Sequence, residues 1–307
     1  MRGMRPRGAI LAARVGAFAF LAIALLVTAC ASTAPSPLAQ EWYDLGNAWL
    51  DKGDWKKAGQ AYSRALALQP SLVGASFNMA RALAEAGDYK ASMGILDAIV
   101  KRDPGNVRVI SARAYTLYKK GDAAAALIAY REALALDPYA PDAVYNVALL
   151  EFTAGDAATA ANDLDRLTSA KPDDGQALLL LGRARDKTGE ADAALAAYEK
   201  AKALGKADAE ALARMGALYE SSRRYSEAMD ALEAAVKADP KRAAAWFGLA
   251  RLRLVVAEDA EKGLEALKGA LAAGFSDKDA ASALLAEPDL PEREKVFELL
   301  KSKSLAE

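Results

Sequence analysis

Apolar and small side chains recur three and four positions apart along most of the chain, in stretches of about 13 residues. This spacing places them on one face of a helix. The two faces of the first such pair of stretches are formed by Trp42, Leu45, Gly46 and Trp49, and by Ala58, Tyr62 and Ala65. Small residues at the contact let two helices approach closely, so the pattern predicts packed helix pairs.

The helix pairs repeat with a period of 34 residues, which two residue types mark independently. A glycine followed by an acidic residue recurs at Gly53, Gly87, Gly121, Gly155 and Gly189. A proline recurs at Pro70, Pro104, Pro138, Pro172 and Pro240, with Lys206 in the skipped slot. Glycine ends the first helix in a left-handed conformation, the acid caps the second helix, and the proline closes it. Seven units are predicted, beginning near Ala39, Val73, Val107, Pro141, Gly175, Ala209 and Ala243.

Some positions depart from the period. Ile99 and Leu167 replace the small residue equivalent to Ala65, and Arg223 stands where the turn glycine of the sixth unit is expected. The seventh unit has one extra residue before Gly263, which predicts an altered turn. Residues 276–307 leave the period altogether. We expect this segment to form a helical cap, because the end of a repeat array otherwise exposes an apolar face; a docking element is the alternative.

The first unit resembles the tetratricopeptide repeat family at nearly every signature position; equivalent positions of successive repeats are called a column. The matching residues are Trp42, Leu45, Gly46, Trp49, Ala58, Tyr62, Ala65 and Pro70. The resemblance covers about 39–275 and implies an all-α fold, a right-handed superhelical solenoid of about seven helix-turn-helix repeats. In this family the first helix of each pair lines a concave surface that usually holds peptides.

The N-terminus is interpreted separately, because it has the layout of a secretory signal. Arginines precede an uncharged apolar run of about 15 residues, which is shorter than the roughly 20 needed to span a bilayer. The run ends at Cys30 in a sequence that resembles the lipobox of bacterial lipoproteins. The resemblance implies a signal peptide over 1–29, a lipidated Cys30 and a tether over 30–38. An uncut membrane anchor is the alternative.

The resemblance to lipoproteins also implies a location. Two or more acyl chains anchor a protein stably, so the chain is expected to be held at a membrane through its N-terminal lipid. No aspartate follows Cys30. In lipoproteins of Gram-negative bacteria, that absence implies the outer membrane, with the protein facing the periplasm.

Composition excludes several chemistries. The chain has no histidine and a single cysteine, so ordinary metal sites, a histidine relay and an intramolecular disulfide are not expected. No glycine-rich phosphate loop is present, and we predict no catalytic residues, no cofactor and no enzymatic activity. Loss of the four signal arginines would leave a net charge of about −5, which argues against a nucleic-acid partner. The sequence predicts no oligomeric state.

We assign to the concave surface implied by the family the residues on one face of the first helix of each pair. This face adjoins the one that packs in the core. The candidate peptide-binding residues are Tyr43, Asn47, Phe77, Arg81, Arg108, Tyr115, Tyr118, Tyr145, Phe152, Arg183 and Arg251. Aromatic and arginine side chains are favourable anchors for peptides. The alternative is that the aromatic rings fill space between adjacent repeats.

Three of the surrounding positions are similar to the carboxylate clamp of one subfamily, which binds the C-termini of chaperones. Asn47, Asn78 and Arg108 match it, whereas Tyr43 and Ala112 stand where basic residues are expected, so the clamp is incomplete.

These observations predict a non-catalytic, lipid-anchored scaffold that binds a protein or peptide in its concave groove and supports assembly of an envelope complex. Related lipoproteins of this architecture assist assembly of pili, secretins or the outer membrane, or cell-wall synthesis. Two alternatives share the fold: a carrier that takes a small apolar ligand for a transporter, and a regulatory subunit that works through its convex face.

Overall fold

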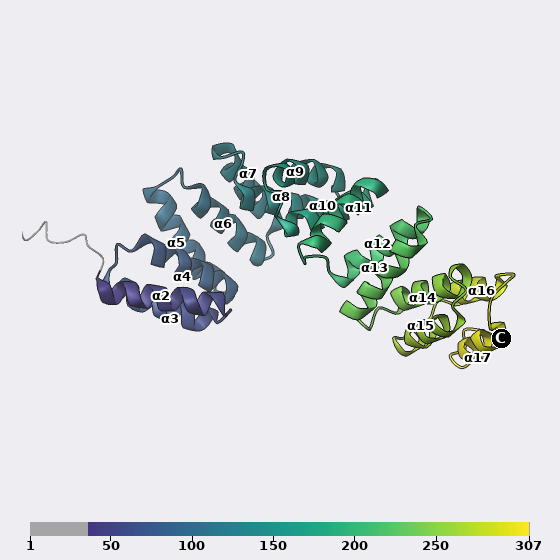
Figure 1. Cartoon of the computed structure of the whole chain (residues 1–307). Helices are drawn as coiled ribbons and strands as arrows, with labels where there is room; N and C mark the ends of the chain where they lie inside the picture. The colour runs from purple at the N-terminus through teal and green to yellow at the C-terminus, as the bar shows by residue number, and fades with distance from the viewer. Residues whose placement is uncertain (1–35, 307) are drawn as a thin grey trace, which may run out of the picture. The chain divides into compact units, whose positions relative to one another are not determined.

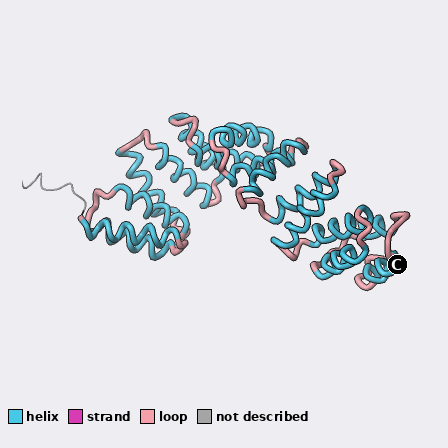
Figure 2. Tube along the Cα trace, in the orientation of Figure 1, coloured by secondary structure: helices cyan, strands magenta, loops and turns pink. Residues whose placement is uncertain are grey.

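The computed structural model describes residues 36–306, and every regular element within that range is a helix (Figures 1 and 2). The first eight α-helices are α2 (Pro37–Asp51), α3 (Trp55–Leu68), α4 (Val73–Glu85), α5 (Tyr89–Arg102), α6 (Val107–Lys119), α7 (Ala123–Leu136), α8 (Pro141–Thr153) and α9 (Ala157–Ala170). The next five are α10 (Gly175–Lys187), α11 (Ala191–Ala203), α12 (Ala209–Ser221), α13 (Tyr225–Ala238) and α14 (Ala243–Arg251). A π-helical segment η1 (Leu252–Val256) and the helices α15 (Ala260–Ala272), α16 (Lys278–Ala286) and α17 (Arg293–Lys301) complete the described chain. The all-α repeat architecture is therefore confirmed.

The chain divides into two compact units, whose boundary falls inside α7 between Ala129 and Tyr130. Each unit consists of consecutive helix pairs that pack against their neighbours along the chain. None of the helices within 36–306 is long and apolar enough to cross a membrane. Cys30 and the predicted signal peptide lie outside the described residues.

The repeat boundaries follow the predicted period. Six of the predicted unit starts coincide with the first residue of a helix, from Val73 in α4 to Ala243 in α14. The first unit differs, because α2 begins at Pro37 and includes Leu38, two residues that were predicted to belong to the tether. Proline favours the first position of a helix, since its missing N–H would have no partner there and its φ is already helical.

The turns inside the pairs confirm most of the predicted caps. The five period-marking glycines all have positive φ, and the acid behind four of them accepts a hydrogen bond from the first turn of the next helix. Glu190 was expected to cap α11, but its carboxylate binds Thr188 and Arg185 instead. Arg223 takes the place of the sixth glycine with a φ of 58°.

In the first and fifth pairs, close approach of the two helices depends on a glycine at the same position of the repeat. A Cβ at Gly182 would lie 2.5 Å from the Tyr198 ring, and Gly46 is equally close to the Tyr62 ring. Both tyrosines are buried beneath α10 and α2 respectively. Leu45 was expected in the same core, but it is 40% exposed because no repeat precedes α2 within the described residues.

The seventh pair contains the extra residue that the sequence indicated. Instead of a longer turn alone, α14 continues into the π-helical segment η1, and Glu258 then adopts the positive φ that ends the helix. A π-helical turn has one more residue than an α-helical turn, so it absorbs a single insertion. The altered turn was predicted, but the sequence did not show that the insertion lies inside the helix.

The predicted C-terminal cap is confirmed as helical. The helices α16 and α17 bury Leu284, Val296 and Leu300 in the core of the second unit. Phe275, in the preceding turn, stacks on Phe247 of α14 with ring centroids 4.0 Å apart.

Candidate functional site

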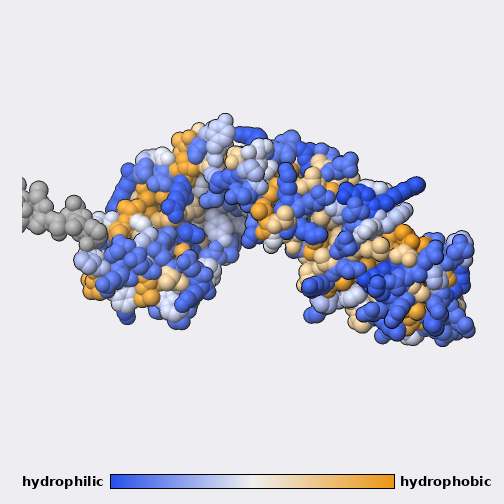
Figure 3. Space-filling view, in the orientation of Figure 1, coloured by the Kyte–Doolittle hydropathy of each residue, from blue (hydrophilic) through white to orange (hydrophobic). Residues whose placement is uncertain are grey.

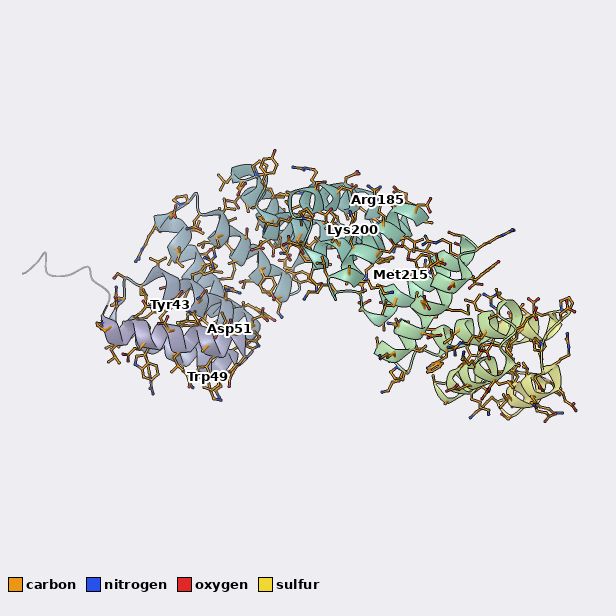
Figure 4. The ribbon with its side chains drawn as sticks, in the orientation of Figure 1. Tyr43, Trp49, Asp51, Arg185, Lys200 and Met215 are labelled. Carbon is orange, nitrogen blue, oxygen red and sulfur yellow. The ribbon has the colours of Figure 1, made fainter. Side chains whose placement is uncertain are left out.

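In the first unit, polar side chains of α2 and α4 form a hydrogen-bond network around Asn47. The Oδ1 atom of Asn47 accepts from Asn78 Nδ2 and from the Tyr62 hydroxyl, each at 2.8 Å. Asn78 is buried and also lies 3.4 Å from the Tyr43 hydroxyl. Figure 4 shows Tyr43 on the side of α2 that faces α4, with Trp49 on the opposite side. The two amides that resemble the carboxylate clamp thus bind each other.

The environment of Tyr62 shows that this network is partly shielded from water. Burial raises the pKa of the Tyr62 hydroxyl to about 12, while the nearby amide of Asn78 and the positive charge of Arg81 both oppose the rise. The same charge opposes the rise in the pKa of Tyr115 on α6. Arg81 therefore lies within electrostatic reach of both hydroxyls, on the helix α4 between α2 and α6.

Arg81 has a free positive charge. Its side chain is exposed, and no carboxylate of residues 36–306 lies within 4.0 Å of it. Arg108, at the first turn of α6, is also exposed, and its guanidinium lies 4.6 Å from the centroid of the Phe77 ring. Phe77 itself is only 8% exposed and packs with Leu96 and Val109, so its ring supports Arg108 from within the core.

Tyr115 and Tyr118 form the next part of this surface. Their ring centroids are 6.4 Å apart, and Tyr118 is 36% exposed. The Tyr115 hydroxyl donates to Glu85 at 2.5 Å, and Lys119 forms an ion pair with the other oxygen of Glu85 at 3.1 Å. Burial and the bond to Glu85 both raise the pKa of Tyr115. These contacts tie α4 to α6 and fix the edge of the surface.

Sequence reasoning missed Glu85 and Lys119. They occupy the same column of consecutive repeats, 34 positions apart, so an acid and a base in one column were the signal that could have identified the pair. The name basic surface is used below for Arg81, Arg108, Tyr43, Tyr115 and Tyr118.

The predicted aromatic residues of the second unit are partly buried. Tyr145 and Phe152 pack against a core that includes Val144, Ala148 and Leu181. Lys187 lies 5.8 Å from the Phe152 ring centroid. Space filling between repeats accounts for most of the surface of these two rings, and their role in binding stays a prediction.

The predicted arginines of the second unit are bound to carboxylates of neighbouring repeats. Arg183 on α10 pairs with Asp208, which precedes α12, and Arg251 on α14 pairs with Glu220 on α12. A third pair of this kind joins Arg214 to Asp186 through two bonds of 2.7 Å. Because each charge is already neutralised, these arginines are poorly placed to recruit an anionic group from a partner.

A pocket lies in the C-terminal cap, away from all predicted site residues. It has a volume of about 530 Å³ and is lined by Leu285, Arg293, Glu294 and Phe297. The Arg293 guanidinium donates to backbone carbonyl oxygens at the end of α16 and beyond it, including Pro288 at 2.9 Å. Its charge therefore holds the cap together. The small-ligand alternative concerns the aromatic groove and not this pocket, and it stays a prediction.

The described residues bring no three acidic or sulfur ligands together in a geometry that could hold a metal ion. The absence of catalytic residues and of a cofactor stays a prediction.

Comparison with family models places repeats along most of the chain. The model described as the cytochrome c-type biogenesis protein H TPR domain matches residues 34–143. Two models described as tetratricopeptide repeat match residues 145–209 and 209–252.

Two relatives illustrate the range of similar proteins. Tetratricopeptide repeat protein 16 of Mus musculus is 32% identical over 111 residues, which are 36% of this chain and 14% of that protein. An uncharacterized lipoprotein of Treponema pallidum (strain Nichols) is 30% identical over 97 residues, which are 32% of this chain and 50% of the lipoprotein. The chain thus spans half or less of the length of these curated relatives.

Solved structures resemble the fold. YrrB, described as a TPR protein with an unusual peptide-binding site, superposes with a TM-score of 0.55 at 22% identity, covering 61% of this chain and 96% of YrrB. PilF of Pseudomonas aeruginosa gives a TM-score of 0.59 at 18% identity, covering 66% of this chain and 92% of PilF. At this identity the likeness concerns the fold alone.

Proposed function

This chain is a tetratricopeptide repeat protein, and we propose that it is a non-catalytic adaptor whose basic surface holds an acidic peptide segment of a partner protein. One observation carries the proposal. Arg81, Arg183 and Arg251 occupy the same column of three repeats, yet only Arg81 lacks a carboxylate partner within residues 36–306. An exposed guanidinium of this kind has its donors free for a carboxylate from another molecule.

The surroundings of Arg81 define the peptide that fits. Arg108 adds a second exposed charge. The ring of Tyr118 adds apolar surface, and its few rotatable bonds keep the loss of conformational entropy on binding small. A carboxylate, from a side chain or a C-terminus, would bind Arg81, and an apolar side chain of the same segment would rest on Tyr118. The network around Asn47 holds α2 against α4, so little ordering is required when a peptide binds.

YrrB, which shares this fold, is described as having a peptide-binding site, so the fold is compatible with a peptide ligand. Lipid anchoring at Cys30, a location at the outer membrane facing the periplasm, and a role in assembling an envelope complex are parts of the proposal. The similarity to a Treponema pallidum lipoprotein supports the anchoring.

A peptide selection on the purified protein tests the site directly. Peptides recovered from a random display library should carry Asp, Glu or a free C-terminal carboxylate next to an apolar residue. Arg81→Glu should lower their affinity at least tenfold, since it replaces an attraction of about 1.5–3 kcal/mol by a repulsion. A peptide with Lys in place of the acid should regain affinity for Arg81→Glu only.

A matched pair of double variants separates the site from general effects. Arg81→Glu with Tyr118→Ala should lose the selected peptide, whereas Arg102→Glu with Tyr139→Ala, which alters the same residue types at exposed positions elsewhere, should bind it as the wild type does. Circular dichroism should show equal helicity for both. Binding that survives in the first variant, or selected peptides without any acid, would overturn the basic surface as the site.

Anchoring is tested separately at Cys30. Cys30→Ala should abolish incorporation of labelled palmitate and release the protein from the envelope membrane, because the thiol that carries the lipid is gone. Normal labelling of Cys30→Ala would disprove anchoring and leave the peptide site unaffected.

A second candidate function rests on the match of residues 34–143 to the cytochrome c-type biogenesis protein H TPR domain. The acidic segment would then belong to a protein of cytochrome c maturation. Deletion of the gene should deplete covalent haem in the membrane fraction, measured by haem staining, and Arg81→Glu should fail to restore it. Normal haem staining in the deletion strain would remove this candidate.

A further inference from the structure

The free side of the first helix pair carries an apolar stripe that begins near the predicted lipidation site. Leu38, Trp42, Leu45 and Trp49 are spaced four, three and four positions apart on α2, which places them on one side of the helix. Leu38 is 50% exposed and Leu45 is 40% exposed, whereas both tryptophans are partly buried and also pack against the core of this pair. In Figure 3, orange patches interrupt the blue surface of this helix pair.

The exposure of this stripe is specific to the first repeat. In three later repeats the residue in the column of Leu45 is buried, with Met215 and Leu249 each 1% exposed and Leu181 7% exposed. Those side chains are covered by the repeat that precedes them, and no described repeat precedes α2. At the other end, α16 and α17 cover the last repeat pair. Among residues 36–306, the array is therefore capped at one end only.

Cations line the stripe and contact its tryptophan rings. The Arg64 guanidinium lies 4.4 Å from the Trp42 ring centroid, and the Nζ atoms of Lys57 and Lys52 lie 4.4 and 5.1 Å from the Trp49 ring centroid. Lys57 is 55% exposed, although it also pairs with Asp54. Tryptophan combined with long basic side chains is the composition that favours the interface between water and a bilayer.

We propose that this stripe, Leu38, Trp42, Leu45 and Trp49, lies against the interfacial region of the membrane to which the protein is tethered. The proposal rests on the anchoring at Cys30 put forward above. Cys30 stands seven positions before Pro37, the first residue of α2, so the connection spans at most about 25 Å. Such a short connection keeps the stripe close to the bilayer, and insertion of the rings removes apolar surface from water.

The position of the stripe also fits the proposed adaptor. Tyr43 of the basic surface lies on the opposite side of α2 from Trp49 (Figure 4). Contact of the stripe with the bilayer would thus leave the peptide site facing away from the membrane, accessible to a partner.

Tryptophan quenching in membranes tests the proposal on the processed full-length protein. Trp55→Phe with Trp246→Phe leaves only Trp42 and Trp49, and a second variant with Trp42, Trp49 and Trp55 replaced by Phe leaves only Trp246. Both are added to vesicles of phosphatidylglycerol and brominated phosphatidylcholine. The first should show several-fold stronger quenching and a blue shift, and the second little change, because Trp246 belongs to the second unit.

A charge variant of the stripe gives the matched control. In the two-tryptophan background, Leu45→Glu with Lys52→Glu should lose the quenching. Leu136→Glu with Lys120→Glu should keep it, since Leu136 is also exposed, at 52%, but lies far along the chain. Each positive charge lost should lower partitioning onto the anionic vesicles by roughly fivefold, and added salt should act in the same direction. Equal quenching of Trp246 and the stripe, or quenching that survives Leu45→Glu with Lys52→Glu, would overturn the proposal.

Two further outcomes are distinguishable. Burial of Trp42 and Trp49 by a second copy would appear as a dimer in sedimentation without vesicles, and it would also overturn the membrane assignment. Palmitate labelling reports on anchoring alone. Quenching without labelling would refute the lipid at Cys30 and retain the membrane-facing stripe. Labelling without quenching would retain the lipid at Cys30 and refute the membrane-facing stripe.

Discussion

Gly182 and Gly46 occupy the same place in two repeats, and each faces a tyrosine ring of its own helix pair. In the second pair alanine takes the place of the glycine, and Ala80 packs with Leu96. In these pairs, a small residue on one helix thus makes room for a larger side chain on the other. At this scale, the fit between two side chains determines the spacing of the repeats.

Gly182→Ala is expected to destabilise the second unit by about 1–3 kcal/mol, because its new methyl group would overlap the Tyr198 ring. Gly94→Ala is the control, since a methyl group on this exposed residue of α5 meets nothing within 4 Å. It should stabilise the first unit by about 0.5–1 kcal/mol through helix propensity. Urea unfolding followed by circular dichroism measures both, and a loss of the same size for both variants would contradict the account.

Glu151 is a buried charged residue whose cost to folding depends on pH. Its carboxyl is buried on α8, and Arg131 is 3.1 Å from one oxygen while the other has no partner in the described chain. Burial raises the pKa of Glu151, and the bond from Arg131 opposes the rise. The folded chain therefore binds this proton more tightly than the unfolded chain, and the free energy of unfolding falls as the pH rises from the ordinary carboxyl range through the raised value.

Glu151→Gln removes this titration, so its Tm relative to that of the wild type should be higher at about pH 7 than at about pH 4. Thermal unfolding at the two pH values tests this. Glu132→Gln, which alters an exposed carboxyl on α7, should show no such trend. A difference for Glu151→Gln that stays constant with pH would show that the carboxyl is already ionised without cost.

At the scale of the element, the turn inside each helix pair requires a left-handed residue. Glycine supplies it in the first five repeats, whereas Arg223 and Glu258 supply it in the last two. A residue with a Cβ pays roughly 1–2 kcal/mol for that conformation. The helices α12 and α13 nevertheless pack closely, because Met215, Leu232 and Val236 bury their side chains in the shared core.

Arg223→Gly is expected to stabilise the second unit by about 1 kcal/mol, since it removes the strain without altering a buried contact. Gly189→Arg is the reverse change at the same place one repeat earlier, where φ is 82°. It should lower the free energy of unfolding of the second unit by a similar amount. Chemical denaturation of the two variants tests the prediction, and no gain for Arg223→Gly would mean that the arginine side chain has a stabilising role of its own.

The elements were largely predictable from the sequence, because glycine, proline and the capping acid act locally. Six helix starts follow from the period alone. Glu190 shows the limit, since a glutamate has the right charge for a cap but is held by Arg185 and Thr188. The site was less predictable. Whether Arg81 or Arg183 carries a free charge depends on acids 25 or more positions away, such as Asp208, that share no column with them.

At the scale of the whole molecule, the chain has contacts mainly between neighbouring repeats. In such an array, stability is a sum over repeats and their interfaces, so a local change has a local effect. The second unit has one continuous core from α10 to the cap, which includes Leu178, Leu267 and Val296. Damage to the cap should consequently reach α15 and α14 before it reaches any earlier helix.

Val296→Asp places a carboxylate at a fully buried position of α17 and should destabilise the cap by several kcal/mol. Hydrogen exchange read by mass spectrometry should show lost protection in α15 to α17 and unchanged protection in α2 to α6. Val256→Asp, at a position that is 39% exposed, is the control and should leave the pattern intact. Uniform loss of protection along the chain would show that the two units unfold together.

The π-helical segment η1 has a consequence for how this protein can change over generations. An extra residue inside an α-helix rotates every later side chain by about 100°, which would turn buried residues toward water. Because Leu252–Val256 take up the insertion in one widened turn, Leu254 stays buried and Asp259 still caps α15. The effect of the insertion on side-chain direction is thereby confined to these five residues. Repeats can gain length in this way while the surfaces that stack remain the same.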